Sequence, residues 1–541
     1  MERSSDPAAT TDGSPHLPAA PLLTVPALLA ERARTRGDHP LLICDDDVLT
    51  YVDAASRSAA LAKGLLATGA GKGTHVGMLH PNGSAIVVAW LAAARIGAVS
   101  VPLSTFSTSD ELRTLLRSAD IEVLLAATSY RGRDYVEALR EVVPGLDPAA
   151  ASPILSPEAP ALRRVVFDPA ALVEAGEGIA DEVLIATERG VRPSDRMVIV
   201  HTSGSTSAPK GVIHQHGPLI RHLGVLNELR RYGPDEILFS NSPFFWIGGF
   251  AYSLLGTLLA GATLVCSNAT DPSMTLDLLE RTRPTMVNGF AAAVAHLAED
   301  PSFPARDLTS IRRGNLWPIM PAAARAADPE LRHNMLGMTE AGSVCLASDD
   351  EGDQPEHRRG SFGRPVPGLE TRIVDPETGA ECGVGEPGEL WLRGPCLMEG
   401  YYGREWHETF TPEGWYRTGD LCRVDADGFH YFIGRHGDMI KTAGANVAPR
   451  EVEAAIVDAT GLVAHVVGID HPERGQLVAA AVRVPPGQEP PDEGELRTAL
   501  RTRLSAYKVP RRYLFLADHE VPMLSSGKLD ARALKELIGP G

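Results

Sequence analysis

The stretch from Val198 to His216, VIVHTSGSTSAPKGVIHQH, joins an apolar run to a short segment rich in hydroxyls and glycine. Met197–Val200 predicts a buried strand, because short apolar runs are typical of strands covered on both faces. The strand leads into Thr202–Gly211, which carries one lysine, Lys210. Glycines let consecutive backbone N–H groups converge on an anion, and Ser and Thr add hydroxyl donors. The segment therefore predicts a loop that binds phosphate, with Lys210 as its cation.

Two other interpretations of this loop are weaker. The same composition occurs in flexible Ser/Gly connections, but linkers rarely follow a β-run directly and end in Pro-Lys-Gly. The common phosphate loop, G-x-x-x-x-G-K-[ST], matches the spacing of Gly204 and Lys210. It fails where Pro209 replaces its second glycine and Gly211 replaces its magnesium-binding hydroxyl. A nucleoside triphosphatase of that type is therefore disfavoured.

Composition and charge narrow the class of protein. The 541 residues are enough for two or more domains, and the apolar fraction of 44% permits substantial cores. The formal charge of −18 opposes a chain-wide attraction to nucleic acid or anionic lipid, so no nucleic-acid partner is expected. The six cysteines are scattered and form no C-x-x-C pair, which disfavours a zinc site or a disulfide scaffold.

The sequence also bears on location. Residues 1–22 are predicted to be a disordered tail, because they are rich in Ala, Pro, Ser, Thr and Asp and lack the apolar core of a signal peptide. The most apolar stretch, Ala85–Leu103, is broken by Arg95, Gly97 and Pro102. It suits a helix followed by a strand better than a transmembrane segment. A cytoplasmic location is the expectation.

Helical patterns alternate with short apolar runs before the phosphate loop. This alternation predicts a layered α/β domain with parallel strand pairing. The expected helices are Val25–Arg36, Tyr51–Ala67, Ser84–Ile96, Glu111–Ala119 and Pro218–Arg230, and the expected strands are His75–Leu79, Ala98–Leu103, Ile121–Ala126 and Glu236–Ser240.

The later part of the chain has a different pattern. Gly414–Asp420 predicts a compact polar turn, and the alternating residues around Asp427-Gly428 predict a hairpin. From Pro449 onward, a helix, two strands and a second helix predict a small α+β domain of about a hundred residues. The sequence thus divides into a large α/β part and a small C-terminal part.

Five motifs stand out along the chain: TSGSTSAPKG (202–211), GMTE (337–340), YRTGD (416–420), GRHGDMIKTAGANVAPREVE (434–453) and SSGKLD (525–530). Their order and rough separations are those of the adenylate-forming, or AMP-binding, superfamily. The chain resembles that superfamily, and within it the acyl-CoA synthetases and fatty-acid–CoA ligases, over nearly its whole length beyond the N-terminal tail. Nonribosomal-peptide adenylation domains and firefly-luciferase-like enzymes are other members.

The resemblance implies an organisation and a reaction. A large N-terminal domain would span residues 23–434, with a hinge at 435–437 and a mobile C-terminal domain at 438–541 that closes over the active site in two orientations. A carboxylate would attack the α-phosphate of ATP to give acyl-AMP and pyrophosphate, and a nucleophile would then displace AMP. Adenylation supplies a stable leaving group, while magnesium and cationic donors stabilise the transferring charge.

The resemblance also implies where the triphosphate binds. The loop would hold the β- and γ-phosphates with Lys210 as its cation, Thr339 would contact phosphate and Glu340 would bind magnesium. Lys528 would enter only in the adenylation orientation, to meet the carboxylate and the α-phosphate. The implied contacts of the loop are Thr202, Ser203, Gly204, Ser205, Thr206 and Lys210.

Other motif positions would hold the nucleoside and CoA. Asp420 resembles the aspartate that accepts both ribose hydroxyls, which suits the paired oxygens of a carboxylate. Arg435 would contact ribose or phosphate. In the second orientation Lys441 and Gly444 would face the active site, with Gly444 leaving room for the thiol arm. The implied adenine contacts are Gly314, Asn315, Leu336 and Gly337.

Three positions depart from the family pattern. Leu336 stands where Tyr or Phe often stacks on adenine, so aliphatic packing would have to cover the base. Gly437 stands at the hinge, where Asp or Lys is frequent, so rotation is sterically easy but a latching side chain is lost. Arg313–Pro318 replaces the usual small-residue adenine loop. None of these changes removes the phosphate, magnesium or ribose contacts.

An aromatic segment, Phe244–Phe250, is predicted to form the acyl pocket together with Val287–Phe290 and Gly314–Leu316. Trp246 is the candidate for its wall or gate, although core packing is the alternative for a segment of this composition. An amino-acid adenylation domain commonly has an aspartate here to pair with the substrate ammonium, and this segment has none. We therefore expect a hydrophobic acid, whether fatty, alicyclic or aromatic. The predicted pocket residues are Phe245, Trp246, Asn288 and Gly289.

The predicted activity is formation of an acyl-CoA from a hydrophobic acid, with ATP, Mg²⁺ and CoA as the required small molecules. An adenylating enzyme that transfers the acyl group to an amine or to a carrier-protein thiol is the main alternative. A nucleotide-binding regulatory protein is a second alternative, opposed by the retention of Lys210, Glu340, Asp420, Arg435 and Lys528. The expected partner is a small carboxylic acid, and assembly as a homodimer is left open.

Overall fold

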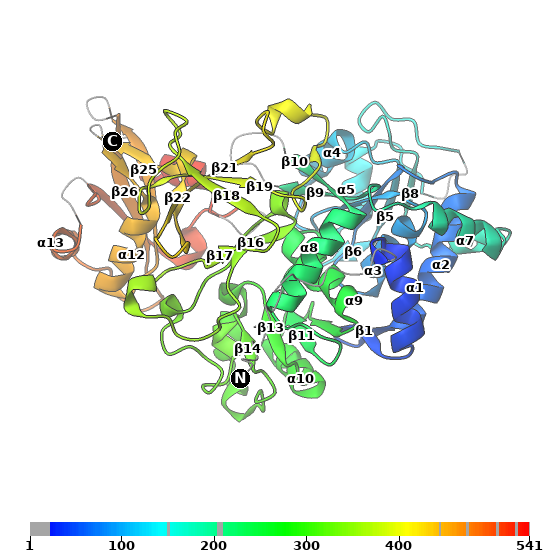
Figure 1. The fold of residues 1–541 in the computed structure, drawn as a ribbon, viewed down its shortest axis with the longest axis horizontal. Helices are drawn as coiled ribbons and strands as arrows, with labels where there is room; N and C mark the ends of the chain where they lie inside the picture. Colours follow the sequence, from blue (N-terminus) through cyan, green and yellow to red (C-terminus); the bar gives the residue numbers. More distant parts are fainter. Residues whose placement is uncertain are drawn as a thin grey trace, which may run out of the picture.

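The computed structural model describes residues 22–148, 152–202, 209–442, 445–471, 475–504, 508–524 and 529–539. Two large sheets, of seven and six strands, organise the N-terminal part of the chain (Figure 1). Most neighbouring strands in each sheet are parallel, as the helix–strand alternation predicts.

The seven-stranded sheet carries the phosphate loop. In spatial order its strands are β20 (Gly400–Tyr401), β10 (Lys210–Gln215), β9 (Arg196–Thr202), β4 (Val99–Pro102), β3 (His75–Leu79), β5 (Val123–Ala126) and β8 (Arg164–Val166). β9 runs parallel to β4 but antiparallel to β10, and β10 runs antiparallel to β20. The carboxyl end of β9 is therefore also the neck of a hairpin.

Two of the three segments predicted to line the acyl pocket, Val287–Phe290 and Gly314–Leu316, begin in strands of the six-stranded sheet. In spatial order its strands are β14 (Arg313–Gly314), β13 (Met286–Asn288), β11 (Ile237–Ser240), β12 (Thr263–Cys266), β1 (Pro40–Cys44) and β2 (Asp47–Thr50). A further two-stranded hairpin consists of β6 (Ser129–Tyr130) and β7 (Arg133–Asp134).

Helices cover both faces of both sheets, so helix and sheet layers alternate. The largest hydrophobic core lies between the two sheets, and smaller cores lie on their outer faces. The central helices are α1 (Val25–Arg36), α2 (Tyr51–Ala67), α3 (Ser84–Arg95), α8 (His216–Leu229), the π-helix η2 (Gly248–Leu255) and α9 (Gly256–Ala260), with α6 (Ala170–Gly176) and α7 (Asp181–Gly190) beside them. The outer faces are covered by α4 (Ser109–Ser118) and α5 (Tyr135–Val142) on the first sheet, and by α10 (Pro272–Thr282) and α11 (Ala295–Ala298) on the second.

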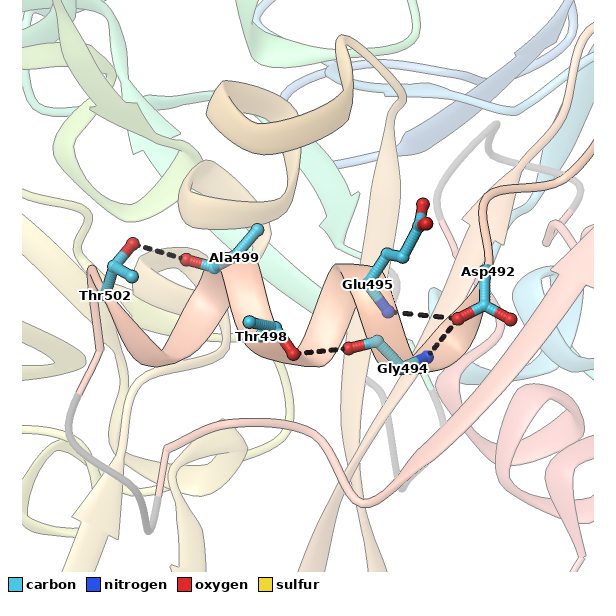
Figure 2. Close-up of a pocket in the computed structure, with 6 residues that line it drawn as sticks. All are labelled: Asp492, Gly494, Glu495, Thr498, Ala499 and Thr502. Carbon is cyan, nitrogen blue, oxygen red and sulfur yellow. Dashed lines mark hydrogen bonds between the residues drawn. The ribbon is translucent and has the colours of Figure 1, made fainter.

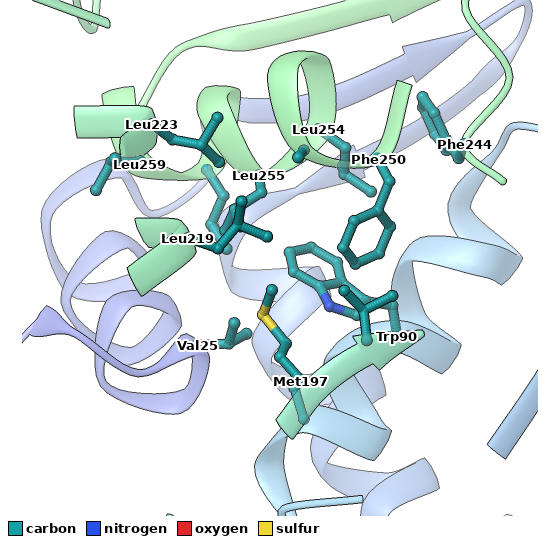
Figure 3. Packing of buried hydrophobic residues seen from close by; sticks show 14 of the residues in the cluster. Val25, Trp90, Met197, Leu219, Leu223, Phe244, Phe250, Leu254, Leu255 and Leu259 are labelled. Carbon is teal, nitrogen blue, oxygen red and sulfur yellow. The ribbon is translucent and has the colours of Figure 1, made fainter. Parts of the chain in front are cut away.

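Trp90 of α3 lies at the centre of the core between the sheets (Figure 3). It is fully buried, and its ring packs edge-on against Phe250 with centroids 5.2 Å apart. Met197, in β9, is fully buried in the same core. The strand that delivers the phosphate loop is thereby anchored in the most tightly buried part of the molecule.

Two small antiparallel sheets follow. One consists of β15 (Leu336–Met338), β16 (Ser343–Ala347) and β17 (Arg364–Pro365), and the other of β18 (Glu370–Val374), β19 (Gly388–Arg393), β21 (Tyr416–Val424) and β22 (His430–Arg435). The hairpin at Asp427-Gly428 is confirmed, since it joins β21 to β22. The compact turn predicted over Gly414–Asp420 is wrong from Tyr416 onward, because those polar residues form the first half of β21.

The C-terminal part forms a separate five-stranded sheet (Figure 1). Apolar residues alternate between its two faces, so one face packs on α12 and α13 and the other on α14. Its strands are β24 (Ala445–Val447), β23 (Ile440–Thr442), β26 (Gly475–Arg483), β25 (Ala464–His471) and β27 (Arg512–Leu516), and its helices are α12 (Pro449–Thr460), α13 (Glu493–Arg501) and α14 (Ala531–Ile538).

The predicted fold class is confirmed: the chain has a large α/β part and a small α+β part. The expected helices Val25–Arg36 and Tyr51–Ala67 and the expected strand His75–Leu79 are found with those bounds as α1, α2 and β3. The sequence pattern missed β10, the second strand of the phosphate-loop hairpin. Within the described ranges, no helix is both long and apolar enough to cross a membrane.

Three histidines predict how stability depends on pH. His214, His216 and His222 are buried, and the loss of hydration lowers the pKa of each to about 4 from an ordinary value of 6.5. As the pH falls below 6.5, the unfolded chain takes up protons that the folded chain does not accept until near pH 4. We therefore expect the free energy of unfolding to fall by about 1.4 kcal/mol per pH unit for each of these histidines.

Urea unfolding at several pH values between about 7 and about 5 measures this slope, because carboxylates stay ionised over that range. His222→Gln should reduce the slope by one proton. A free energy of unfolding that is constant across this range would contradict the prediction.

Candidate active site

The phosphate-loop hairpin brings Thr202 and Lys210 face to face. They are paired residues of β9 and β10, and Gly211 pairs with His201. A Cβ at Gly211 would lie 2.8 Å from Cγ2 of Ile199, so only glycine fits there. The ammonium of Lys210 lies 5.1 Å from the centre of the Tyr401 ring. The loop is shorter than Thr202–Gly211, because both ends of that range belong to strands; Ser203, Gly204, Ser205 and Thr206 lie outside the described residues.

The predicted phosphate and magnesium contacts, Thr339 and Glu340, lie in a single 3-10 turn, Thr339–Ala341. Nε2 of His214, on β10, donates to the carbonyl of Thr339 at 2.7 Å. The low pKa of His214 keeps its ring neutral, which suits a donor at Nε2. The backbone N–H of Met398 donates to the carbonyl of Glu340 at 2.8 Å. The turn is thus tied by its backbone to the phosphate-loop hairpin.

The carboxylate of Glu340 fits a magnesium ion. Its Oε1 accepts a hydrogen bond of 2.8 Å from the hydroxyl of Tyr401. Mg²⁺ in nucleotide sites is usually held by one or two carboxylates together with phosphate oxygens. Among the described residues no cluster of three or more His, Cys, Asp or Glu side chains could hold a metal by itself. A magnesium ion at Glu340 would therefore arrive with its nucleotide.

Asp420 and Arg435 are paired residues of the β21–β22 hairpin. Nε of Arg435 donates to Oδ1 of Asp420 at 2.9 Å. The side chain of Asp420 is only 5% exposed, whereas that of Arg435 is 63% exposed. A buried carboxylate beside an exposed guanidinium suits the two predicted contacts to ribose and phosphate.

The predicted adenine wall and acyl wall are joined by asparagines. The side chain of Asn315 accepts from the N–H of Gly289 and donates to its carbonyl, both at 3.0 Å. Asn241 binds both backbone groups of Phe290 in the same way, each at 2.9 Å. A Cβ at Gly289 would lie 1.8 Å from Oδ1 of Asn241, so glycine is required there. The segment Gly289–Phe290 is thereby held from both sides.

Leu336 and Gly337 lie in β15, on the strand that leads into the turn of Thr339 and Glu340. A Cβ at Gly337 would lie 2.7 Å from the carbonyl oxygen of Ser343, and one at Gly314 would lie 1.8 Å from that of Val287. Both glycines are therefore fixed by close backbone packing. Leu336 is half-buried against the central core.

Four aromatic rings gather near the predicted acyl pocket. Trp246 lies edge-on to Phe245 and to Phe290, with centroids 5.4 Å apart in each pair, and Phe106 lies 5.5 Å from Phe245. Phe290 is half-exposed and Phe245 is buried. Phe244, by contrast, is fully buried in the core between the sheets, and Val287 and Leu316 are buried in another core. Those three residues pack the interior instead of lining a pocket, because their side chains are fully enclosed in these cores.

The hinge position, Gly437, is exposed, and an added Cβ there would meet nothing within 4 Å. Lys441 lies in β23, where its backbone pairs with that of Asn446. Gly444 and Lys528 lie outside the described residues, as does the side chain of Lys441.

A hollow over α13 holds none of the predicted site residues (Figure 2). Oδ1 of Asp492 accepts from the N–H groups of Gly494 and Glu495 at 2.8 and 3.0 Å. Thr498 and Thr502 donate their hydroxyls to helix carbonyls, each at 2.7 Å. These polar groups are engaged by the helix itself, so the hollow adds nothing to the site.

The comparisons with known proteins agree with this geometry. The family model described as AMP-binding enzyme matches residues 29–402, and the AMP-binding enzyme C-terminal domain matches residues 451–528. The chain therefore belongs to the AMP-binding enzyme family. The predicted superfamily is thereby confirmed.

Two curated relatives and one solved structure illustrate the family. The mouse (Mus musculus) medium-chain acyl-CoA ligase ACSF2, mitochondrial, is 30% identical over 92% of this chain and 84% of its own length. Feruloyl-CoA synthase of Amycolatopsis sp is 32% identical over 89% of this chain and 92% of its own length. The o-succinylbenzoate CoA synthetase MenE of Bacillus subtilis was solved with ATP and a magnesium ion. It is 25% identical in sequence, and the match covers 94% of this chain and 99% of that chain with a TM-score of 0.75. The predicted enzyme class, an AMP-forming acid–CoA ligase, is confirmed.

The site yields a direct binding prediction. Asp420→Asn should weaken ATP binding about 10-fold, because the ribose hydroxyls lose a charged acceptor. Isothermal titration with ATP measures the dissociation constant. Asp427→Asn is the matched control, since Asp427 is an exposed residue at the far end of the same hairpin and pairs with Arg358. Equal ATP affinity in Asp420→Asn and the unmodified protein would contradict the assignment.

Proposed function

We propose that this protein is an ATP-dependent ligase that converts a hydrophobic carboxylic acid into its CoA thioester and releases AMP and pyrophosphate. The observation that carries the proposal is the meeting of Lys210 and Glu340 at one tyrosine. The ammonium of Lys210 lies 5.1 Å from the ring of Tyr401, whose hydroxyl donates to Glu340 at 2.8 Å. The Tyr401 ring thereby contacts a cation suited to phosphate, and the Tyr401 hydroxyl contacts a carboxylate suited to a metal.

Each residue of the site has a separate task in this reaction. Lys210 and Thr202, at the neck of the hairpin, neutralise and hold the terminal phosphates. The turn of Thr339 and Glu340 faces the same phosphates, and a magnesium ion there would screen their charge as the pyrophosphate leaves. Asp420 and Arg435 fix the ribose. Lys528 is proposed to bring the carboxylate oxygen and the α-phosphorus together.

A hydrophobic acid fits the aromatic cluster. Phe106, Phe245, Trp246 and Phe290 offer ring edges and faces, and all four of these side chains are uncharged. Such a wall favours apolar acyl groups over an amino acid, whose ammonium would be left without a partner. The relatives named for medium-chain and feruloyl substrates both take acids of this broad kind.

CoA is the proposed acceptor, and the motif around Lys441 and Gly444 is proposed to face the active site in the second orientation. Rotation at residues 435–437, between domains spanning 23–434 and 438–541, is part of the proposal. The exposed Gly437 supports it, since the backbone there is unobstructed. A cytoplasmic location and assembly as a homodimer are further proposals. All six cysteines are free thiols, as is usual in a reducing compartment.

Incubation with ATP, Mg²⁺, CoA and a panel of fatty, alicyclic and aromatic acids tests the proposed function. We expect AMP and a thioester for at least one acid, detected by liquid chromatography and mass spectrometry. AMP without any thioester would reject CoA as acceptor and favour an amine or a carrier-protein thiol, which replacement of CoA by amines distinguishes. Absence of acid-dependent pyrophosphate release with every acid would favour a nucleotide-binding regulatory protein.

The position of Trp246 leads us to expect that its ring limits the size of the acid that the enzyme accepts. Trp246→Ala removes the ring that contacts both Phe245 and Phe290, so the pocket should admit bulkier acids. We expect the ratio of kcat/KM for the bulkiest accepted acid to that for the smallest to rise about 10-fold. Trp406→Ala is the control, since Trp406 is half-exposed and stacks on Phe410. An unchanged ratio would show that Trp246 does not border the acid.

A further inference from the structure

Tyr401 connects the two charged groups of the triphosphate site. It lies in β20, where it pairs with Val212 of β10. Lys210 and Val212 are two residues apart on β10, so their side chains lie on the same face of the strand. Tyr401 therefore stands beside Lys210 on that face, within a small hydrophobic cluster that includes Val212, Met398 and Tyr416.

The contacts of Tyr401 are directional. Its hydroxyl must donate to Oε1 of Glu340, at 2.8 Å, because a carboxylate only accepts. That hydroxyl has a single proton, so the Tyr416 hydroxyl, 3.0 Å away, donates to the Tyr401 oxygen. The chain of donors runs from Tyr416 through Tyr401 to the carboxylate.

The ring of Tyr401 makes a second, independent contact. The ammonium of Lys210 lies 5.1 Å from its centre, within range of a cation–π attraction. Tyr401 is 7% exposed, so both contacts lie in a low-dielectric environment that strengthens them. One rigid side chain thus sets the separation between Lys210 and Glu340.

From this geometry we propose that Tyr401 is a positioning residue that holds the Glu340 carboxylate and the Lys210 ammonium in register for the magnesium-bound triphosphate. The proposal rests on the proposed function. It goes beyond that function by assigning the coupling of metal ligand and cation to a tyrosine that lies outside the five sequence motifs. The hydroxyl acts on Glu340, and the ring acts on Lys210.

Isothermal titration with ATP, in excess Mg²⁺ and again in EDTA, separates these two effects. Tyr401→Phe keeps the ring and removes the hydroxyl, so it should weaken ATP binding about 10-fold in Mg²⁺ and leave binding in EDTA unchanged. Tyr401→Leu also removes the ring, so ATP binding in EDTA should weaken about 3-fold. Tyr402→Phe is the matched control, because the hydroxyl of this neighbouring tyrosine donates to Asp120 outside the site.

The outcomes are distinct. If Tyr401→Phe weakens ATP binding equally in Mg²⁺ and in EDTA, or weakens it in neither, the proposal is overturned. If Tyr401→Phe fails to fold, Tyr416→Phe decides: it should weaken binding about 3-fold in Mg²⁺ only, and an unchanged affinity would overturn the proposal. If Mg²⁺ does not strengthen ATP binding in the unmodified protein, the proposed function fails instead.

Discussion

The antiparallel pairing of β9 with β10 is the constraint on which the rest of the site depends. β9 runs with the parallel strands of its sheet, and β10 turns back beside it, so Thr202 and Lys210 stand opposite each other at the neck of the loop. β10 also supports the turn of Thr339 and Glu340. His214 of β10 donates to the Thr339 carbonyl, and β20, which pairs with β10, carries the Tyr401 hydroxyl that donates to Glu340. A shift of one residue in this pairing would turn Lys210 to the opposite face and separate it from Tyr401.

The periodic parts of the chain were predictable, and the polar parts of the site were not. α1 and α2 have the expected bounds because their apolar faces pack on the central core. The sequence does not predict β10, because KGVIHQ has only two apolar residues. It predicts a turn at Tyr416–Asp420 because that segment is polar and contains glycine, whereas the segment forms the first half of β21. Tyr401 gave no sequence signal, since its contact with Glu340 spans 61 residues and exists only in the folded chain. Phe244 and Phe245 could not be told apart by composition, although one enters the core and the other joins the aromatic cluster.

The nucleotide half and the acid half of the proposed site differ in the kinds of groups that form them. In the proposed site, charged and hydroxyl groups would bind the nucleotide, whereas aromatic rings and backbone would shape the acid side. Asn315 and Asn241 hold the segment between them by paired backbone hydrogen bonds. Such amide pairs fix a loop without adding charge, so the acid wall stays apolar while the nucleotide wall stays rigid. Substrate choice can therefore vary without disturbing the phosphate chemistry.

The central claim is that the acid attacks the α-phosphorus of ATP in a site assembled on this hairpin. Isotope transfer tests that claim most directly. With the acid that is turned over fastest, labelled with oxygen-18 in its carboxylate, one labelled oxygen should appear in AMP after thioester formation, as measured by mass spectrometry. Label in inorganic phosphate, or in no phosphorus-containing product, would contradict the account, because the acyl group would then have been activated at another phosphate or not through ATP.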